Sequence, residues 1–244
     1  MPINMFSDRT AVVTGASSGI GRALALSLAE HGARLALLGR NTEALETVAA
    51  QAQGGSAHVV CYTVDLRSDQ DLSHTIAQIQ DHFQGVDMLI HSAGVLIPAM
   101  LEATSRDDFD QHYQVNVRAP HVLTQALLPQ LKARQGQVVF INSSVGQQAR
   151  ATVGPYAASK HALKALADSL RDEVNTNGVR VLSLYLGRTA SPLQEQLHRQ
   201  EGRPYRPERL IQPEDVAAIV VNALSLSRTV EVTDIHLRPC LKPL

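Results

Sequence analysis

The chain has 244 residues, of which 44% are hydrophobic and 18% charged, and its formal net charge is −1. This composition is sufficient for one well-buried α/β domain over residues 1–244, and it provides neither a basic field for nucleic acid nor a polybasic patch for a membrane. Cys61 and Cys240 do not form a disulfide framework, and residues 1–9 lack a signal-peptide pattern, so we expect a soluble cytoplasmic protein.

Apolar runs typical of strands alternate along the chain with patterns typical of helices. The predicted strands span residues 10–14, 34–39, 58–64, 86–91, 137–142, 179–185 and 230–237. The predicted helices span residues 19–31, 42–52, 69–83, 107–134, 155–176 and 214–226. Ser68 with Asp71 predicts a helix cap, and Gly178 a helix end. The alternation predicts a doubly wound parallel sheet with helices on both faces.

A glycine-rich turn follows the first predicted strand. It reads Thr14-Gly15-Ala16-Ser17-Ser18-Gly19-Ile20-Gly21, and a helical pattern comes next. Glycines let the backbone approach a pyrophosphate, and a helix N-terminus offers N–H groups and a partial positive charge to it. This order of strand, turn and helix predicts a dinucleotide site, with an ordinary glycine-containing turn as the alternative.

Arg40 follows the second predicted strand, in Leu35-Ala36-Leu37-Leu38-Gly39-Arg40-Asn41. A fold that prefers NAD usually has an acid near this place, which accepts a hydrogen bond from the ribose 2′-hydroxyl. No acid is present at this strand end, and the guanidinium of Arg40 can pair with a 2′-phosphate. We therefore predict NADP(H) in preference to NAD(H). A solvated arginine at a helix start is the alternative.

Tyr156 and Lys160 lie four residues apart in Gly154-Pro155-Tyr156-Ala157-Ala158-Ser159-Lys160. At this spacing they share one helix face, and Pro155 suits a first helical turn. An ammonium beside a phenol, whose usual pKa is about 10, favours the ionised form. The pair predicts a proton donor or acceptor for a substrate oxygen. A tyrosine against the core beside a solvated lysine is the alternative.

Together the motifs T-G-x-x-x-G-I-G and Y-x-x-x-K resemble the short-chain dehydrogenase/reductase family, in its single-domain branch, over nearly the whole chain. The resemblance implies a Rossmann-type fold of about seven strands. It also implies a catalytic tetrad of Asn116, Ser143, Tyr156 and Lys160. Ser144 takes the place of Ser143 if the loop between the serines and Tyr156 carries a deletion. Either serine alternatively ends a strand by bonding to its own backbone.

The resemblance implies a role for each member of the tetrad. Tyr156 donates a proton to a carbonyl oxygen as the nicotinamide delivers hydride to the carbon, and Ser143 hydrogen-bonds that oxygen. Lys160 lowers the pKa of Tyr156 and holds the nicotinamide ribose, and Asn116 holds a water that links Lys160 to solvent. We predict a carbonyl reductase or alcohol dehydrogenase. The alternatives are a non-catalytic cofactor-binding sensor or scaffold and an epimerase or dehydratase of the extended branch.

The resemblance also implies the cofactor contacts, which follow successive strands and so meet at one edge of the sheet. These residues are Gly15, Ser17, Ser18, Gly19, Ile20, Gly21, Arg40, Asp65, Leu66, Ser92, Ala93, Gly94, Tyr156, Lys160, Gly187 and Thr189, and no metal site is predicted. Three positions depart from the common pattern. Ser92 replaces the asparagine of Asn-Ala-Gly, Leu186 replaces the proline of Pro-Gly, and Ser191 stands where threonine often contacts the carboxamide.

Residues 188–212, the lid segment, lie where the family places its substrate lid. The segment is polar, and one of its arginines is a candidate clamp for an acidic substrate, with a solvated helix and loop of mixed charge as the alternative. Those arginines are Arg199, Arg203, Arg206 and Arg209. A second set forms an apolar pocket wall or part of the core. It consists of Val95, Leu96, Ile97 and Met100.

Small residues recur along the helix after Tyr156, at Ala158, Ala162, Ala165 and Ser169. Small side chains let a second helix approach closely. The resemblance implies that this helix and the one before Gly136 pair across a two-fold axis, so we expect a homodimer or homotetramer. Packing of the same residues against the chain's own sheet is the alternative.

Overall fold

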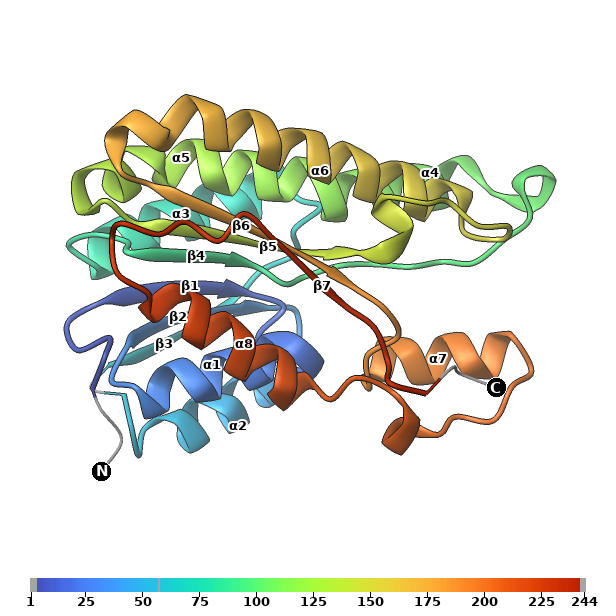
Figure 1. The fold of residues 1–244 in the computed structure, drawn as a ribbon, viewed down its shortest axis with the longest axis horizontal. Helices are drawn as coiled ribbons and strands as arrows, with labels where there is room; N and C mark the ends of the chain where they lie inside the picture. Colours follow the sequence, from blue (N-terminus) through green and yellow to red (C-terminus); the bar gives the residue numbers. More distant parts are fainter. Residues whose placement is uncertain (1–3, 57, 242–244) are drawn as a thin grey trace.

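Seven parallel strands form one sheet in the computed structural model, which describes residues 4–56 and 58–241 (Figure 1). Along the sheet the strands follow the order β3-β2-β1-β4-β5-β6-β7. They are β1 (Thr10–Thr14), β2 (Arg34–Gly39), β3 (Val59–Thr63), β4 (Met88–His91), β5 (Gln137–Ser143), β6 (Arg180–Leu186) and β7 (Asp234–Leu237). Strands β1 to β3 are added toward one edge of the sheet and β4 to β7 toward the other, so the strand order reverses between β1 and β4. This order confirms the predicted doubly wound fold.

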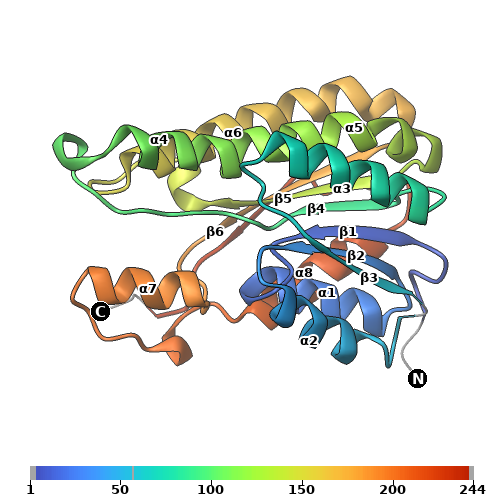
Figure 2. The same ribbon diagram turned by 180° about the vertical axis from the view of Figure 1, so that it is seen from behind.

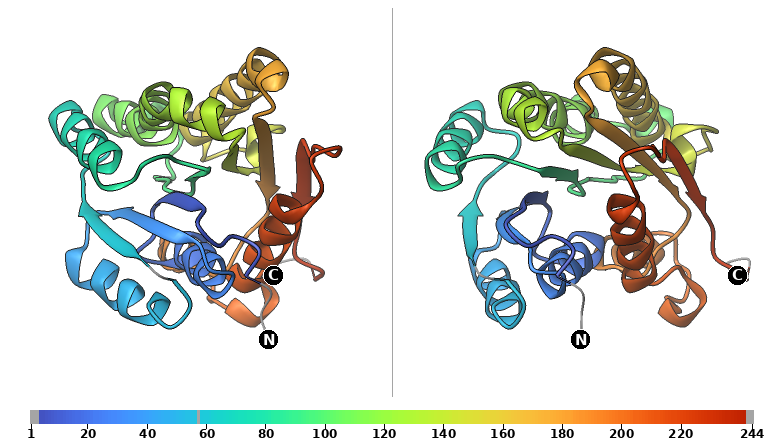
Figure 3. Two further views of the ribbon diagram at one scale, coloured as in Figure 1. Left: turned by 90° about the vertical axis from the view of Figure 1, so that its left-hand side faces the viewer. Right: turned by 60° about the vertical axis from the view of Figure 1, so that its left-hand side comes forward.

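Helices cover both faces of this sheet (Figures 1 and 2). One face carries α1 (Gly19–Glu30), α2 (Thr42–Ala52) and α8 (Pro213–Ser225). The other carries α3 (Asp69–His82), α5 (Ala119–Arg134) and α6 (Gly154–Val174), with α4 (Arg106–Tyr113) beside them. End views show the same three layers (Figure 3). The short helix α7 (Pro192–Gln200) lies apart, at one end of the sheet.

The core consists of two apolar layers, one on each side of the sheet. Strand β2 contributes to both, because successive side chains in a strand point to opposite faces. Leu35 and Leu37 pack in the layer that contains α1 and α8, and Ala36 and Leu38 pack in the layer that contains α3 and α5. All four are fully buried. Burial on both faces explains why the strands are continuous apolar runs.

Local signals fix several element ends where the sequence predicts them. The Ser68 hydroxyl accepts from the backbone N–H of Asp71 at 3.1 Å, which caps α3. Gly178 adopts a left-handed conformation with φ of 71° before β6 begins. The predicted strand over 230–237 is correct only from Asp234 onwards. Residues 230–233 before it have no regular structure, and the Val230 carbonyl accepts from Arg180.

The predicted helix over residues 107–134 is interrupted. Helix α4 ends at Tyr113, Gln114–Arg118 forms one π-helical turn, and α5 begins at Ala119. Asn116 lies in this turn and is fully buried. Its side chain bonds to the backbone of Val95 rather than lying against its own helix. A π-helical turn inside a helix frequently marks a functional site.

Candidate active site

The glycine-rich turn connects β1 to the start of α1 at the carboxyl edge of the sheet. Gly15 and Gly19 have positive φ angles of 68° and 51°. A Cβ on Gly21 would lie 2.2 Å from the carbonyl oxygen of Gly15, so only glycine permits this packing of α1 on the turn. The Ser18 side chain makes no capping hydrogen bond to α1. The turn therefore leaves a cradle and backbone N–H groups that fit a dinucleotide pyrophosphate.

The segment after β4 packs against this turn. The Thr14 hydroxyl oxygen accepts from the backbone N–H groups of Ser92 and Ala93, each at 3.1 Å. A Cβ on Gly15 would lie 2.8 Å from the Ala93 Cα. The Thr14 hydroxyl therefore joins the end of β1 to the backbone after β4, even though Ser92 replaces the asparagine that the family pattern predicts. Gly94 lies farther on, where its Cα faces Asn116.

Arg40 and Asp65 come together beyond the ends of β2 and β3. The Asp65 carboxylate accepts from the Arg67 side chain, with contacts of 2.6 to 3.0 Å. Arg67 lowers the pKa of Asp65 and Arg40 contributes to the lowering, which places both cations near this carboxylate. Arg40 itself is exposed, and the neighbouring Leu66 is buried. A guanidinium is thus available at the predicted position of the adenosine ribose.

Ser143 and Tyr156 meet at the end of β5. The Ser143 side chain lies beside the phenol and opposes the effect of burial on the pKa of Tyr156. Burial dominates and raises the pKa of Tyr156 to about 12. Ser144 instead begins a 3₁₀ turn, where its carbonyl accepts from the N–H of Gln147. Of the two candidate serines, Ser143 is the one whose side chain acts on the pKa of the tyrosine.

Lys160 is buried below Tyr156, with only 4% of its surface exposed. Its Nζ donates to the Ile141 carbonyl at 3.0 Å and lies 5.9 Å from the centroid of the Tyr156 ring. Burial lowers the pKa of Lys160 to about 8. The predicted lowering of the Tyr156 pKa by Lys160 is wrong for this structure. The reason is that burial of the phenol raises its pKa, while the Lys160 ammonium is directed toward the Ile141 carbonyl.

The Asn116 side chain is held on both sides. Its Oδ1 accepts from the Val95 N–H at 2.9 Å, and its Nδ2 donates to the Val95 carbonyl and the Ser159 hydroxyl, each at 3.0 Å. A Cβ on Gly94 would lie 3.4 Å from this Oδ1 and 3.8 Å from the Lys160 Nζ. Gly94 therefore separates Asn116 from Lys160. The structure brings all four tetrad residues to one edge of the sheet.

His112 is a site residue that the sequence analysis missed. It is fully buried, and its ring lies 6.1 Å from the ring of Tyr156. Nε2 accepts from the Ile97 N–H at 3.0 Å, so Nδ1 carries the proton and donates to the Asp108 carbonyl at 2.7 Å. Burial lowers the His112 pKa, and Asp108 offsets part of this effect. A lone histidine on a helix gives no sequence signal that it will lie beside the active-site tyrosine.

Asn142 also escaped the sequence analysis, although it lies inside the quoted fifth-strand motif. Its Nδ2 donates to the Lys160 carbonyl at 3.1 Å, and its Oδ1 accepts from the Ser143 N–H at 2.7 Å. A Cβ on Gly146 would lie 2.6 Å from this oxygen. Asn142 therefore fixes the end of β5 to helix α6. In doing so it fixes Ser143 relative to Tyr156.

The apolar residues after β4 do not belong to the core. Val95, Leu96 and Ile97 are partly exposed, and Met100 is 55% exposed. They lie on the loop that leads to α4, on the same side of the sheet edge as Asn116. This exposure agrees with the interpretation of these residues as a pocket wall rather than as part of the core.

The lid segment is bonded mainly to itself. Arg188 donates to both oxygens of Glu201 at 2.8 Å, and its Nη1 lies 3.1 Å from Nε2 of the buried His198. Arg199 lies 3.7 Å from Glu195, and Arg203 lies 3.8 Å from Glu201. These contacts favour a solvated segment of mixed charge over an arginine clamp. A helix, α7, occupies part of the segment.

The start of the lid segment reaches the cofactor cradle. A Cβ on Gly19 would lie 3.2 Å from the Ser191 Cβ. The Ser191 hydroxyl caps α7 by accepting from the Gln194 N–H at 3.2 Å, and it donates to the Thr189 carbonyl at 3.2 Å. A Cβ on Gly187 would meet Pro239 at 2.9 Å. Gly187 and Thr189 thus lie at the same edge as the glycine-rich turn.

Comparison with known proteins agrees with this arrangement. A family model for short chain dehydrogenases matches residues 9–202. The chain belongs to this family. An uncharacterized oxidoreductase of Staphylococcus aureus strain USA300 is 32% identical over 240 residues, which are 97% of this chain and 100% of the relative. The protein is therefore an oxidoreductase of the short-chain dehydrogenase type with an NAD(P)-binding Rossmann fold.

Two solved members of the family share the fold closely. An alcohol dehydrogenase from Thermococcus sibiricus, complexed with 5-hydroxy-NADP, has a TM-score of 0.85 and 28% identity, over 97% of this chain and 99% of that one. A metagenomic short-chain oxidoreductase complexed with NADP has a TM-score of 0.84 and 28% identity, over 98% and 100%. Among the described residues, no helix of this dehydrogenase has the length and apolar character to cross a bilayer.

Proposed function

We propose that the protein is an NADP(H)-dependent carbonyl reductase or alcohol dehydrogenase that acts on a small molecule. The observation that carries this proposal is that Ser143 lies beside Tyr156 at the sheet edge that also holds the glycine cradle. When bound, NADP(H) supplies hydride to a carbonyl carbon or accepts it from an alcohol. The partly exposed residues after β4 provide an apolar wall for the substrate.

Tyr156 acts as the proton donor in this proposal. With a pKa of about 12, the phenol remains protonated at neutral pH, so it has a proton to give. Ser143 donates a hydrogen bond to the same substrate oxygen as negative charge develops on it. A protonated Tyr156 supports the reductive direction, because oxidation of an alcohol needs the phenolate as base.

Lys160 and Asn116 are the buried residues that support Tyr156 in this proposal. The buried ammonium of Lys160 would hold the ribose of the nicotinamide when the cofactor is bound. The Asn116 side chain is occupied by Val95 and Ser159, so it holds the loop and helix α6 in register around the site. A water that links Lys160 to solvent could therefore bind only to the remaining lone pair of the Asn116 Oδ1 or to a backbone carbonyl.

Turnover is the experiment that tests the proposed function. Loss of NADPH absorbance is followed with a panel of ketones, aldehydes and quinones. Reduction of at least one carbonyl class is the expected result. A protein that binds NADPH tightly but reduces none of them, and oxidises none of the matching alcohols with NADP⁺, is a cofactor-binding sensor instead. Tightly retained NAD after purification would favour an epimerase or dehydratase.

We also propose that Arg40 selects NADP(H) over NAD(H). Its guanidinium is exposed beside Asp65 and is free of any carboxylate within ion-pair distance among the described residues. In Arg40→Ala, the Kd for NADPH should rise about tenfold or more, since a charge-assisted bond to phosphate is lost, while the Kd for NADH stays the same. Arg106→Ala, a change at an exposed arginine on α4, is the matched control. Equal affinities for the two cofactors in the unmodified protein would refute this selection.

A two-fold assembly through α6 is the proposed quaternary structure, as a homodimer or homotetramer. Ala158, Ala165 and Ser169 are exposed on this helix and Ala162 is partly exposed, so they do not serve packing on the chain's own sheet. Small side chains on an outer helix face leave room for a second helix. Sedimentation of the purified protein over a range of concentrations tests the assembly, and a monomer at all of them would refute it.

A further inference from the structure

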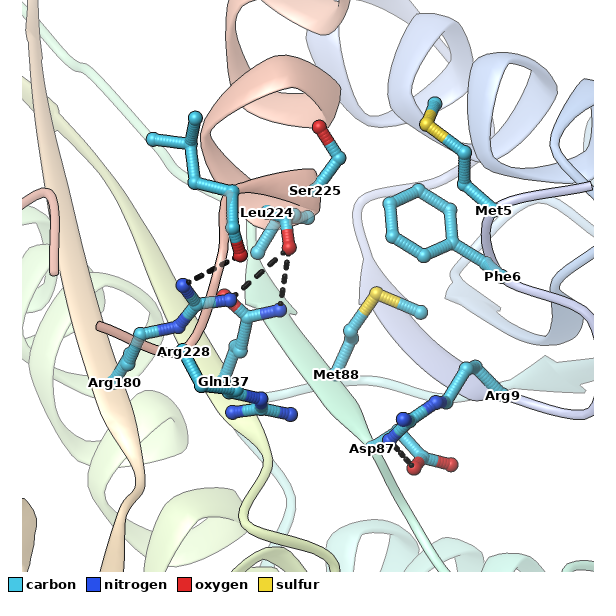
Figure 4. Close-up of a pocket in the computed structure, with 11 residues that line it drawn as sticks. Met5, Phe6, Arg9, Asp87, Met88, Gln137, Arg180, Leu224, Ser225 and Arg228 are labelled. Atoms are coloured by element: carbon cyan, nitrogen blue, oxygen red, sulfur yellow. Dashed lines mark hydrogen bonds and ion pairs between the residues drawn. The ribbon is translucent and has the colours of Figure 1, made fainter. Parts of the chain in front are cut away.

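A cavity of about 300 Å³ lies at the opposite end of the sheet from the candidate active site (Figure 4). It is formed where β4, β5 and β6 begin and where α8 ends. Gln137 and Arg180 are the first residues of β5 and β6, and Asp87 precedes β4. The volume is at the lower end of the range for small-molecule sites. No residue of the proposed reaction lines it.

Three guanidinium groups and one carboxylate line this cavity. Arg9 binds Asp87 at 2.9 Å, so that pair is neutral. Arg228 donates to the Gln135 carbonyl. Arg180 donates to the carbonyl oxygens of Leu224, Leu226, Ser227 and Val230. Within the described ranges, neither Arg180 nor Arg228 has a carboxylate at ion-pair distance.

The guanidinium groups of this cavity are close enough for one to disfavour the charge of another. Burial lowers the pKa of Arg180, and the charge of Arg228 lowers it further. Partial burial and the charge of Arg9 lower the pKa of Arg228, and Asp87 offsets part of this effect. Glu231 offsets part of the effect on Arg180, but its Oε1 also accepts from the Val181 N–H. The Nε of Arg180 is buried without a hydrogen-bond partner in the described structure. An anion in the cavity would relieve this excess of positive charge.

Apart from Gln137 and Ser225, the rest of the lining consists of apolar side chains (Figure 4). Phe6 and Met88 are 5% and 2% exposed and form the floor. Met5 and Leu226 are 39% and 37% exposed, so they lie at a rim that opens to solvent. A ligand that enters here meets an apolar surface and unpaired guanidinium groups together.

We propose that this cavity binds a small organic anion, namely a carboxylate or phosphate ester that carries an apolar group such as a phenyl ring. The anionic group pairs with Arg228 and Arg180, and the apolar group packs on Phe6 and Met88. The site is separate from the dinucleotide and substrate sites, and the inference does not depend on the proposed reaction.

Titration with defined probes tests this site. Benzoate and phenyl phosphate represent the two anion classes, benzamide is the neutral counterpart of benzoate, and acetate lacks the apolar group. Binding is followed by ligand-observed NMR and calorimetry on the full chain. At least one aromatic anion should bind more tightly than acetate, and benzamide should not bind. The stronger of the two aromatic anions identifies the class.

Arg228→Gln locates the binding. This side chain is exposed, so its replacement should leave the fold intact. The Kd of the aromatic anion should rise about tenfold or more, because a charge-assisted hydrogen bond is lost. Lys132→Gln removes an exposed cation that does not line the cavity, and it should change the Kd less than about twofold. Equal affinity in Arg228→Gln and the unmodified protein, or no binding of either aromatic anion, would overturn the proposal.

Discussion

Replacing Lys160 by methionine should stabilise the cofactor-free protein while it abolishes turnover. The ammonium is buried at 4% exposure, and its pKa falls from 10.5 to about 8. Each unit of difference corresponds to about 1.4 kcal/mol, so charging Lys160 in the fold costs on the order of 3 kcal/mol at neutral pH. Methionine leaves the Ile141 carbonyl without its donor, which costs about 1–2 kcal/mol. The net gain is about 1–2 kcal/mol.

The sign of the pH dependence follows from the same pKa values. Between pH 8 and 10.5 the unfolded chain keeps a proton on Lys160 that the folded protein has lost, so the unmodified protein gains stability as pH rises through this window. The penalty is fully present below about pH 8. The stability advantage of Lys160→Met should therefore be largest near neutral pH and should shrink as pH approaches 10.

Urea unfolding followed by far-ultraviolet circular dichroism measures this difference, at neutral pH and near pH 10. Lys164→Met is the matched control, one helical turn further on, where the lysine is partly exposed and pairs with Asp168. Loss of such a surface pair should change the free energy of unfolding by less than about 1 kcal/mol. If Lys160→Met is clearly less stable than the unmodified protein at neutral pH, or if its advantage is the same at both pH values, the reasoning is wrong.

Two further substitutions probe the glycine cradle and the serine beside the proton donor. Gly21→Ala should lower the free energy of unfolding by about 1–3 kcal/mol and weaken NADPH binding, because the added Cβ would lie 2.2 Å from the Gly15 carbonyl oxygen. An unfolding curve and a Kd for NADPH equal to those of the unmodified protein would contradict this prediction. Ser143→Ala should lower kcat by about 10²-fold or more, as loss of an oxyanion donor does, while Ser144→Ala has little effect. The opposite ranking of the two serines in steady-state kinetics would assign the role to Ser144.

The strands and the site edge were predictable because they depend on local patterns. Apolar runs such as Leu35–Leu38 are buried on both faces of the sheet, and a parallel sheet places the residues after each strand at one edge. The glycine-rich turn was predictable for the same reason, since its backbone geometry admits few other residues at Gly21. These features follow from the nearby sequence and the topology alone.

Long-range contacts explain what the sequence did not reveal. The π-helical turn at Gln114–Arg118 contains Asn116, which bonds to Val95 across the site, and helical periodicity carries no trace of that bond. His112 is placed by a loop that precedes it in the chain. The pKa of Tyr156 depends on how deeply the phenol is buried, which spacing to Lys160 does not determine.

Comparison of Tyr156→Phe with the unmodified protein tests the central claim most directly. Turnover and the Kd for NADPH are measured on the same two preparations, with a carbonyl that the unmodified protein reduces. The account predicts that kcat falls by about 10²–10⁴-fold, since the phenyl ring has no proton to give, while the Kd for NADPH changes little. Turnover that survives in Tyr156→Phe would show that another group donates the proton, and the mechanism proposed for this dehydrogenase would be wrong.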